Sequence, residues 1–134
     1  MRNIFSHKSL NTDLASFLLR LIFGGLFVRF GYMKITSFQD LLPIFPDPIG
    51  IGSTLSLMLV IFSEFFCGFL VTIGLMTRLA IIPIFITMTV VVFIIHKQAP
   101  FDEKTLPLLL WLLCLVIFIL GAGNLSVDKK LFKS

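Results

Sequence analysis

Four of the ionisable residues inside or at the ends of the long apolar segments of this chain are candidates for a functional site. They are Arg20, Lys34, Glu64 and His96. A charge at mid-membrane costs roughly 2.5–3.5 kcal/mol on insertion scales, so such side chains usually face a protein interior, a partner or the interface. Grouped together, they would form a buried polar seam that binds the head of a lipid-soluble molecule or relays protons. The sequence does not indicate which of them, if any, is catalytic.

The segment Leu14–Lys34 places polar and small residues on one face of a helix. At about 100° per residue, five positions fall within about 40° of one line. These positions are Arg20, Gly24, Phe27, Gly31 and Lys34. Arg29 lies about 180° from Arg20 and near the helix end, where its long stem reaches the headgroups. We therefore expect Arg20 to face inward and Arg29 to snorkel.

A second apolar segment repeats this helical spacing of residues, starting at Glu64. Gly68, Val71, Leu75 and Arg78 follow it at i+4, i+7, i+11 and i+14. Two seams of matching pitch predict close packing of two helices, with Gly24, Gly31 and Gly68 as the seam glycines. We expect Arg20 to be the partner of Glu64, because the face of Arg20 carries glycines that admit a neighbouring helix. Such a pair is either purely structural or part of a functional pocket, and both interpretations stay open.

The composition excludes an ordinary soluble domain. The chain has 134 residues, of which 57% are hydrophobic and 13% charged, and its mean hydropathy is +1.06. Four apolar segments predict helices over residues 14–35, 55–75, 79–95 and 106–120. The predicted fold is an all-α, polytopic membrane four-helix bundle that forms a single domain over residues 1–134.

One long connection separates the first two predicted helices. The stretch Thr36–Ser56 contains three prolines and two glycines, which preclude a continuous helix, and many apolar residues. It predicts a short interfacial helix followed by an extended turn folded over the mouth of the bundle. The alternative is a loop that merely dips into the headgroups.

The formal charge of +4 does not indicate nucleic-acid binding, because the basic residues cluster at the ends of apolar spans. One side of the predicted bundle carries Arg2, Lys8, Arg78, Lys129, Lys130 and Lys133, and the other carries Lys34, Lys97 and Lys104. The positive-inside rule then predicts that both termini are cytoplasmic. For a bacterial chain this means a multi-pass protein of the inner membrane, with the long loop in the periplasm.

Intrinsic redox chemistry has no signature in this sequence. Cys67 and Cys114 stand alone inside apolar segments, and neither belongs to a C-x-x-C pair. We predict no metal site, no nucleotide site and no intrinsic cofactor. His96 follows the third predicted helix, where it is either a hydrogen-bonding group for a quinone or an interfacial residue.

The order of these features resembles that of the DoxX family of small bacterial membrane proteins. The first stretch is R-x3-G-x6-G-x2-K from Arg20 to Lys34, and the second is E-x3-G-x5-G-x2-T-R from Glu64 to Arg78. His96 follows, and a closing G-x-G-x2-S-x-D runs from Gly121 to Asp128. The resemblance implies a four-helix bundle in the cytoplasmic membrane and an association with redox proteins.

Three functions follow as hypotheses. In the first, the chain is a quinone-linked or redox-associated accessory subunit, with a bound quinone and a membrane or cytoplasmic redox partner. In the second, it is a small transporter for a solute or for protons. In the third, it is a membrane scaffold for a soluble partner enzyme. Each hypothesis places the chain in the lipid bilayer, and each is compatible with a homo-oligomer.

Overall fold

Helices make up the fold of this protein. The computed structural model describes residue 8 and residues 11–132, and this part of the chain contains helices and no strands. Four helical segments are long and apolar enough to cross a membrane: Thr12–Thr36, Ser53–Ile73, Thr77–Ile95 and Phe101–Leu120. The prediction of an all-α polytopic membrane protein is therefore confirmed. Of the residues counted for orientation, Arg2 and Lys133 lie outside the described part.

The first span is one continuous helix, α1 (Thr12–Thr36). Asn11 caps it, because its side chain accepts a hydrogen bond of 3.0 Å from the amide of Leu14. The buried residues of α1 follow the predicted line and include Arg20, Gly24, Phe27 and Gly31, whereas Arg29 is exposed. The inward face of this helix is therefore the face that the spacing predicts.

The second and third spans each contain a π-helical segment. The second consists of α3 (Ser53–Ile61), the π-helix η1 (Phe62–Phe66) and α4 (Cys67–Ile73). The third consists of α5 (Thr77–Val90) and the π-helix η2 (Val91–Ile95). Such segments are rare, and they are frequently found at functional sites. Glu64 lies inside η1, and His96 follows η2 directly.

The fourth span, α6 (Phe101–Leu120), begins five residues before the predicted position. The sequence indicated a polar loop up to residue 105, but Pro100 is the N-cap and Asp102 and Glu103 occupy the first turn. Acidic residues stabilise a helix at this end, so the polar stretch continues the helix instead of interrupting it. A short helix, α7 (Val127–Phe132), ends the described chain.

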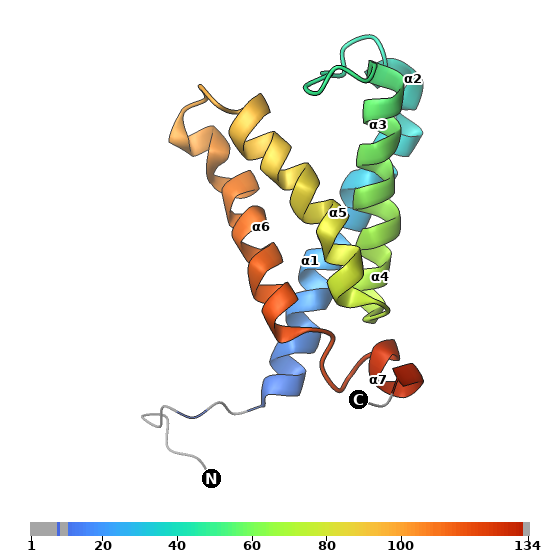
Figure 1. Cartoon of the computed structure of the whole chain (residues 1–134), viewed down its shortest axis with the longest axis vertical. Coiled ribbons are helices and arrows are strands. Elements are labelled where there is room, and N and C mark those ends of the chain that lie inside the picture. The colour runs from blue at the N-terminus through green and yellow to red at the C-terminus, as the bar shows by residue number, and fades with distance from the viewer. Residues whose placement is uncertain (1–7, 9–10, 133–134) are drawn as a thin grey trace.

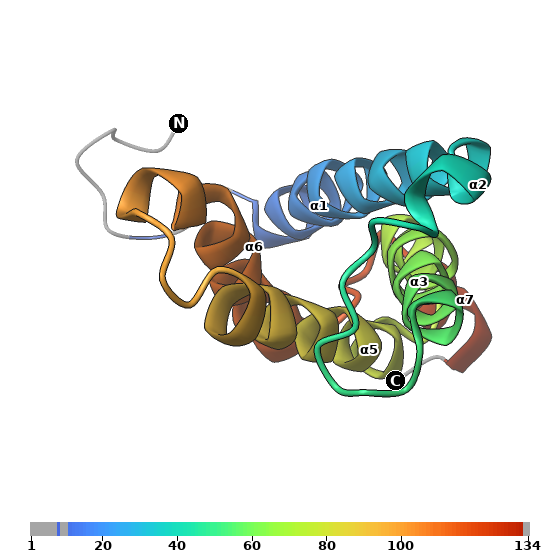
Figure 2. The ribbon, with the colours of Figure 1, turned by 90° about the horizontal axis from the view of Figure 1, so that it is seen from above.

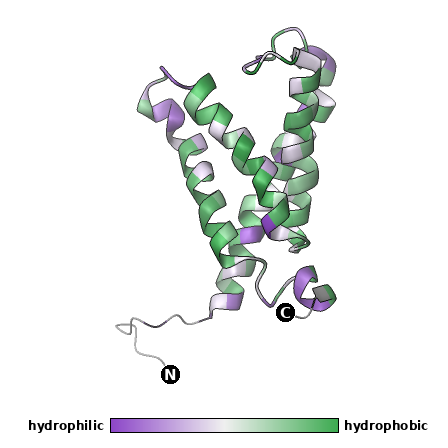
Figure 3. Cartoon of the chain, viewed as in Figure 1, coloured by the Kyte–Doolittle hydropathy of each residue, from purple (hydrophilic) through white to green (hydrophobic). Residues whose placement is uncertain are grey.

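The helices meet at one end of the bundle and separate toward the other. In Figure 1, α1 runs beside α3 and α4, while α5 and α6 form a second pair that moves away from α3 toward the top. We call the lower end of this view, where α1 begins and α7 lies, the Arg20 end, and the upper end the Lys34 end. Figure 3 shows apolar residues along most of each span, with polar residues gathered mainly near the two ends.

A loop covers the Lys34 end between α2 (Phe38–Leu41) and α3. Seen from above in Figure 2, it runs from α2 across to the side of α5 before it returns to α3. Asp47 stabilises the last part of this loop before α3. Its carboxylate accepts hydrogen bonds from the amides of Ile51 (3.0 Å) and Gly52 (2.9 Å). The predicted arrangement, a short helix followed by a turn over the mouth of the bundle, is the one observed.

Candidate functional site

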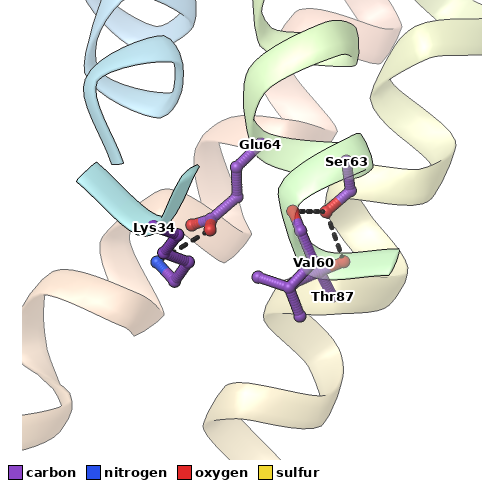
Figure 4. A network of polar contacts seen from close by, with 5 residues as sticks. All are labelled: Lys34, Val60, Ser63, Glu64 and Thr87. Carbon is purple, nitrogen blue, oxygen red and sulfur yellow. Dashed lines mark hydrogen bonds and ion pairs between the residues drawn. The ribbon is translucent and has the colours of Figure 1, made fainter. Parts of the chain in front are cut away.

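Glu64 pairs with Lys34 and not with Arg20. The Nζ atom of Lys34 lies 2.8 Å from Oε1 of Glu64, and the two side chains point toward one another in Figure 4. The side chain of Glu64 is 4% exposed and that of Lys34 is 27% exposed. The expected pairing of Glu64 with Arg20 is therefore wrong. The glycines on the Arg20 face of α1 do admit the second span, as expected. Lys34 lies on this same face, however, and it is closer than Arg20 to the level of Glu64 along the bundle.

Arg20 is instead held by backbone carbonyl groups at the opposite end. Its guanidinium donates to the carbonyl oxygens of Thr72 (3.2 Å) and Val71 (3.4 Å), and also to that of Leu125. The residue is 1% exposed. These contacts join α1 to the end of α4 and to the chain that follows α6. Arg20 therefore fixes the positions of three parts of the fold.

Glycine allows α1 and the second span to approach closely. A Cβ atom on Gly24 would meet Oγ1 of Thr72 in hard contact and would lie 2.7 Å from the carbonyl oxygen of Gly68. A Cβ atom on Gly31 would lie 2.6 Å from the backbone nitrogen of Phe65. Gly24, Gly31 and Gly68 thus lie along the contact between the two helices, and only Gly permits their spacing.

The Lys34–Glu64 pair borders a cavity of about 250 Å³ beneath the loop at the Lys34 end. Apolar residues from the loop, from α3 and from α5 with η2 line most of it. Its polar residues are Lys34, Ser56, Glu64, Thr87 and His96. The structure therefore brings together three of the four predicted site residues, and it places Arg20 elsewhere.

His96 presents a hydrogen-bond acceptor when its ring is neutral. Its Nδ1 atom lies 3.0 Å from the carbonyl oxygen of Val91. A carbonyl oxygen only accepts, so Nδ1 carries the proton and Nε2 keeps its lone pair. Lys34 supplies donors, one of which is directed at the buried Oε1 atom of Glu64. The site thus offers both donors and acceptors.

At the wall of the cavity, one hydrogen bond links the second and third spans. The hydroxyl groups of Ser63 and Thr87 lie 2.8 Å apart, as Figure 4 shows. Ser63 Oγ also lies 3.0 Å from the carbonyl oxygen of Val60, and Thr87 Oγ1 lies 2.9 Å from that of Pro83. Each hydroxyl has one hydrogen, so one hydroxyl donates to the other and the second donates to the carbonyl in its own helix. The link thus holds the second span against α5 at the wall of the cavity.

The closing G-x-G-x2-S-x-D stretch has a structural role at the Arg20 end. Its Asp128 accepts hydrogen bonds from the amides of Met76 (2.7 Å) and Thr77 (3.2 Å) and thereby caps α5. The amide of Asp128 in turn donates to the carbonyl of Gly74 (2.9 Å). Gly74 has φ +78°, a conformation that favours glycine.

A larger hollow of about 510 Å³ lies beside this turn at the Arg20 end. Its charged residues already stabilise helix ends. Asp128 caps α5, and Arg78 donates to the carbonyls of Phe118 (2.9 Å) and Ile119 (3.3 Å) at the end of α6. The smaller cavity at the Lys34 end is therefore the better candidate for a ligand site, because Lys34 and Glu64 do not cap a helix and Nε2 of His96 stays available to a ligand.

Sequence reasoning missed two parts of this arrangement. It did not indicate that the loop residues Phe45, Pro48 and Ile49 line the cavity, although the apolar character of the loop was a signal. It also did not indicate the contact between Ser63 and Thr87, which depends on the distance between two helices. Within the described residues, no group of three or more His, Cys, Asp or Glu is placed to hold a metal ion.

Comparison with known proteins gives one match. The model of the family described as DoxX matches residues 15–97, which include Arg20, Lys34, Glu64 and His96. Neither the curated proteins nor the solved structures contain a match to this chain.

Proposed function

The chain belongs to the DoxX family, and from this premise we propose that it is a quinone-linked accessory subunit of the bacterial inner membrane. The cavity beside the Lys34–Glu64 pair is the observation that carries the proposal. An apolar chamber with a few convergent polar groups is the usual form of a small-molecule site. In a membrane protein, a buried ionisable pair at such a chamber is a candidate functional site.

The donors and acceptors of the cavity fit the two forms of a quinone head. The oxidised head has carbonyl oxygens that accept hydrogen bonds, and Lys34 supplies the donor. The reduced head has hydroxyl groups that donate, and Nε2 of His96 supplies an acceptor. When bound, the quinone would supply two-electron, two-proton redox chemistry. The residues of this chain bind and orient it, and Glu64 fixes the ammonium of Lys34.

A partner protein completes the proposal. The described residues contain no candidate metal cluster, and the two cysteines Cys67 and Cys114 are buried and unpaired. Electrons would therefore reach the quinone from a membrane or cytoplasmic redox protein, for which this chain is the quinone-binding subunit. We further propose that both termini are cytoplasmic, since the more basic end of the bundle is the end where α1 begins.

The packing between the two ends supports binding over transport. Phe27, Val71 and Ile84 are each 0% exposed and belong to the core between α1, α4 and α5. At the Arg20 end, the guanidinium of Arg20 is held by carbonyls and offers no path for a solute. Polar groups therefore do not continue from the cavity to the other end.

Quinone binding by the purified full-length chain tests the proposal. The probe is dimethoxy-methyl-benzoquinone, a quinone head without a tail, measured by equilibrium dialysis in detergent. The variant Lys34→Met/Glu64→Gln removes the donor and leaves no unpaired buried charge. We expect its Kd to rise about tenfold or more, because a hydrogen bond from a charged donor is worth about 1.5–3 kcal/mol.

The matched control is Lys97→Met, a lysine near the same end that does not line the cavity. Its Kd should equal that of the natural chain. Thermal unfolding and size-exclusion chromatography confirm that each variant is folded. If the wild-type chain does not bind the head, or if the folded double variant binds it equally well, the proposed function is wrong.

A further inference from the structure

The cavity is too small to contain a whole membrane quinone. Its volume is about 250 Å³, below the range of about 300–1,000 Å³ that is typical of sites enclosing a drug-sized molecule. A head group therefore fits inside, while a long tail must lie outside. Where the tail leaves the cavity then decides how the ligand arrives and which class of molecule the site accepts.

The cavity wall between α3 and α5 includes exposed apolar side chains. Leu59 on α3 is 49% exposed and Ile86 on α5 is 58% exposed, and both line the cavity. Leu59 lies six residues after the start of α3, or roughly 9 Å along the helix at 1.5 Å per residue. Ile86 lies nine residues before the end of η2, or roughly 13 Å. This wall is therefore at the depth of the lipid chains.

The two helices diverge from a hydrogen bond that lies at about the depth of Ile86, the residue before Thr87. The hydroxyl groups of Ser63 and Thr87 lie 2.8 Å apart, and above them α3 and α5 diverge toward the Lys34 end in Figure 1. The loop closes the top of the cavity with Phe45, Pro46 and Pro48. The loop thus lies over the aqueous side of the cavity, whereas the side wall lies at the depth of the lipid chains.

The charges of the site favour an uncharged head. Lys34 and Glu64 form an ion pair with no net charge, so a phosphate or carboxylate would gain the attraction of Lys34 but meet the repulsion of Glu64. Residues that donate and accept hydrogen bonds remain available to a neutral head. Anionic phospholipids are therefore disfavoured.

From these observations we infer that the site admits a neutral, single-chain amphiphile sideways from the bilayer, between Leu59 and Ile86. Its head lies under the loop and its tail stays among the lipid chains. This inference rests on the proposed function, since it concerns the route and the class of the same ligand. It adds that the tail contributes to binding through the opening and that the loop does not need to open.

A photoreactive quinone tests the route of the tail. The probe carries the dimethoxy-methyl-benzoquinone head and a ten-carbon tail that ends in a diazirine, and it is added to the full-length chain in lipid nanodiscs. After illumination, mass spectrometry identifies the labelled residues. We expect labels on α3 and α5 around Leu59 and Ile86, and we expect excess unlabelled decyl-ubiquinone to remove them. Labels on the loop around Ile49 would overturn the inference.

A tryptophan in the opening provides a second measurement. Ile86→Trp fills the side wall, and we expect it to weaken binding of the tailed probe about tenfold more than it weakens binding of the tail-less head. Phe69→Trp is the control, because Phe69 on α4 is also exposed (53%) and does not line the cavity. Equal binding of the tailed probe by both variants would contradict lateral entry.

The two experiments separate the two proposals. If the tail-less head does not bind the natural chain, the proposed function fails. If the head binds and depends on Lys34 and Glu64, but the tail labels the loop, only the lateral route fails. A fatty acid and an anionic phospholipid serve as competitors, and displacement of the probe by either would overturn the preference for a neutral head.

Discussion

The two ends of the bundle contain buried charges in very different surroundings. At the Arg20 end, the cation is 1% exposed and is held by carbonyl oxygens from α4 and from the chain after α6. At the Lys34 end, Glu64 depends on a single lysine that is 27% exposed and borders a cavity. The first arrangement joins parts of the fold, and the second leaves polar atoms available to a ligand. An ionisable residue within a membrane span is therefore not by itself a sign of function.

The comparison is tested most severely by removing Arg20. Arg20→Met leaves the carbonyls of Val71, Thr72 and Leu125 without their donor. Because hydrogen bonds from charged donors are worth about 1.5–3 kcal/mol each, we expect a loss of more than about 3 kcal/mol in the free energy of unfolding. Urea or heat unfolding of the detergent-purified chain measures it.

Arg29→Met is the control for that experiment, because Arg29 lies on the same helix and is exposed. We expect a change within about 0.5 kcal/mol. Equal destabilisation by the two substitutions would show that Arg20 has no special place in the fold, and the distinction between the ends would be lost.

Close packing of α1 against the second span gives the next largest effect. Gly24→Ala places a methyl group against Oγ1 of Thr72 and the carbonyl of Gly68, so the helices must move apart. We expect a loss of about 1–3 kcal/mol in the free energy of unfolding. Gly25→Ala is the control, since no heavy atom lies within 4 Å of its Cβ position. A neutral result at Gly24 would show that the helices are free to separate there.

The cap that Asp128 provides for α5 should contribute less. Asp128→Ala removes the acceptor for the amides of Met76 and Thr77, and loss of an N-cap costs about 1 kcal/mol. Thermal unfolding detects this loss, with the exposed Asp40→Ala as control. The quinone affinity should stay unchanged, since Asp128 does not line the cavity at the other end. Weaker binding in the Asp128 variant would indicate that the two ends are coupled.

The smallest effect concerns the loop above the cavity and appears only at low pH. The amide of Gly52 and the hydroxyl of Ser56 donate to Asp47 and lower the pKa of its carboxyl group. A lowered pKa means that the carboxylate stabilises the loop above the unfolded pKa of about 3.9 and that this stabilisation is lost as the pH falls below that value.

Hydrogen exchange of the amides of Ile51 and Gly52 measures this change. We expect their protection to be constant from neutral pH to about pH 4 and to fall below it. In Asp47→Asn the protection should be lower and independent of pH. Protection that persists unchanged in this variant would show that other contacts hold the loop.

The sequence alone predicts the local features of this protein well. The four spans and the inward face of α1 depend on hydropathy and helical period, which are properties of neighbouring residues. The early start of α6 was missed because polar residues in a first turn resemble a loop. The partners of Arg20 could not be predicted, because backbone carbonyls carry no signature in the sequence and Leu125 is distant along the chain.

The candidate site was predicted in its members but not in its pairing. Lys34, Glu64 and His96 line one cavity, and all three belong to the predicted polar seam. The period of a helix places Lys34 and Arg20 on the same face, so it cannot show which of the two pairs with Glu64. That choice depends on depth, and depth depends on where each helix begins and on the π-helical segment that contains Glu64.

The π-helix η1 also determines how this protein can be redesigned. A π-helical turn has an i→i+5 hydrogen bond and so contains one residue more than an α-helical turn. Winding Phe62–Phe66 as a regular α-helix, with no residue removed, would rotate one half of the second span against the other by about 100°. Either the packing of α4 against α1 or the cavity face of α3 would be kept, but not both. The extra residue thus reconciles two helical registers, one for assembly and one for the ligand.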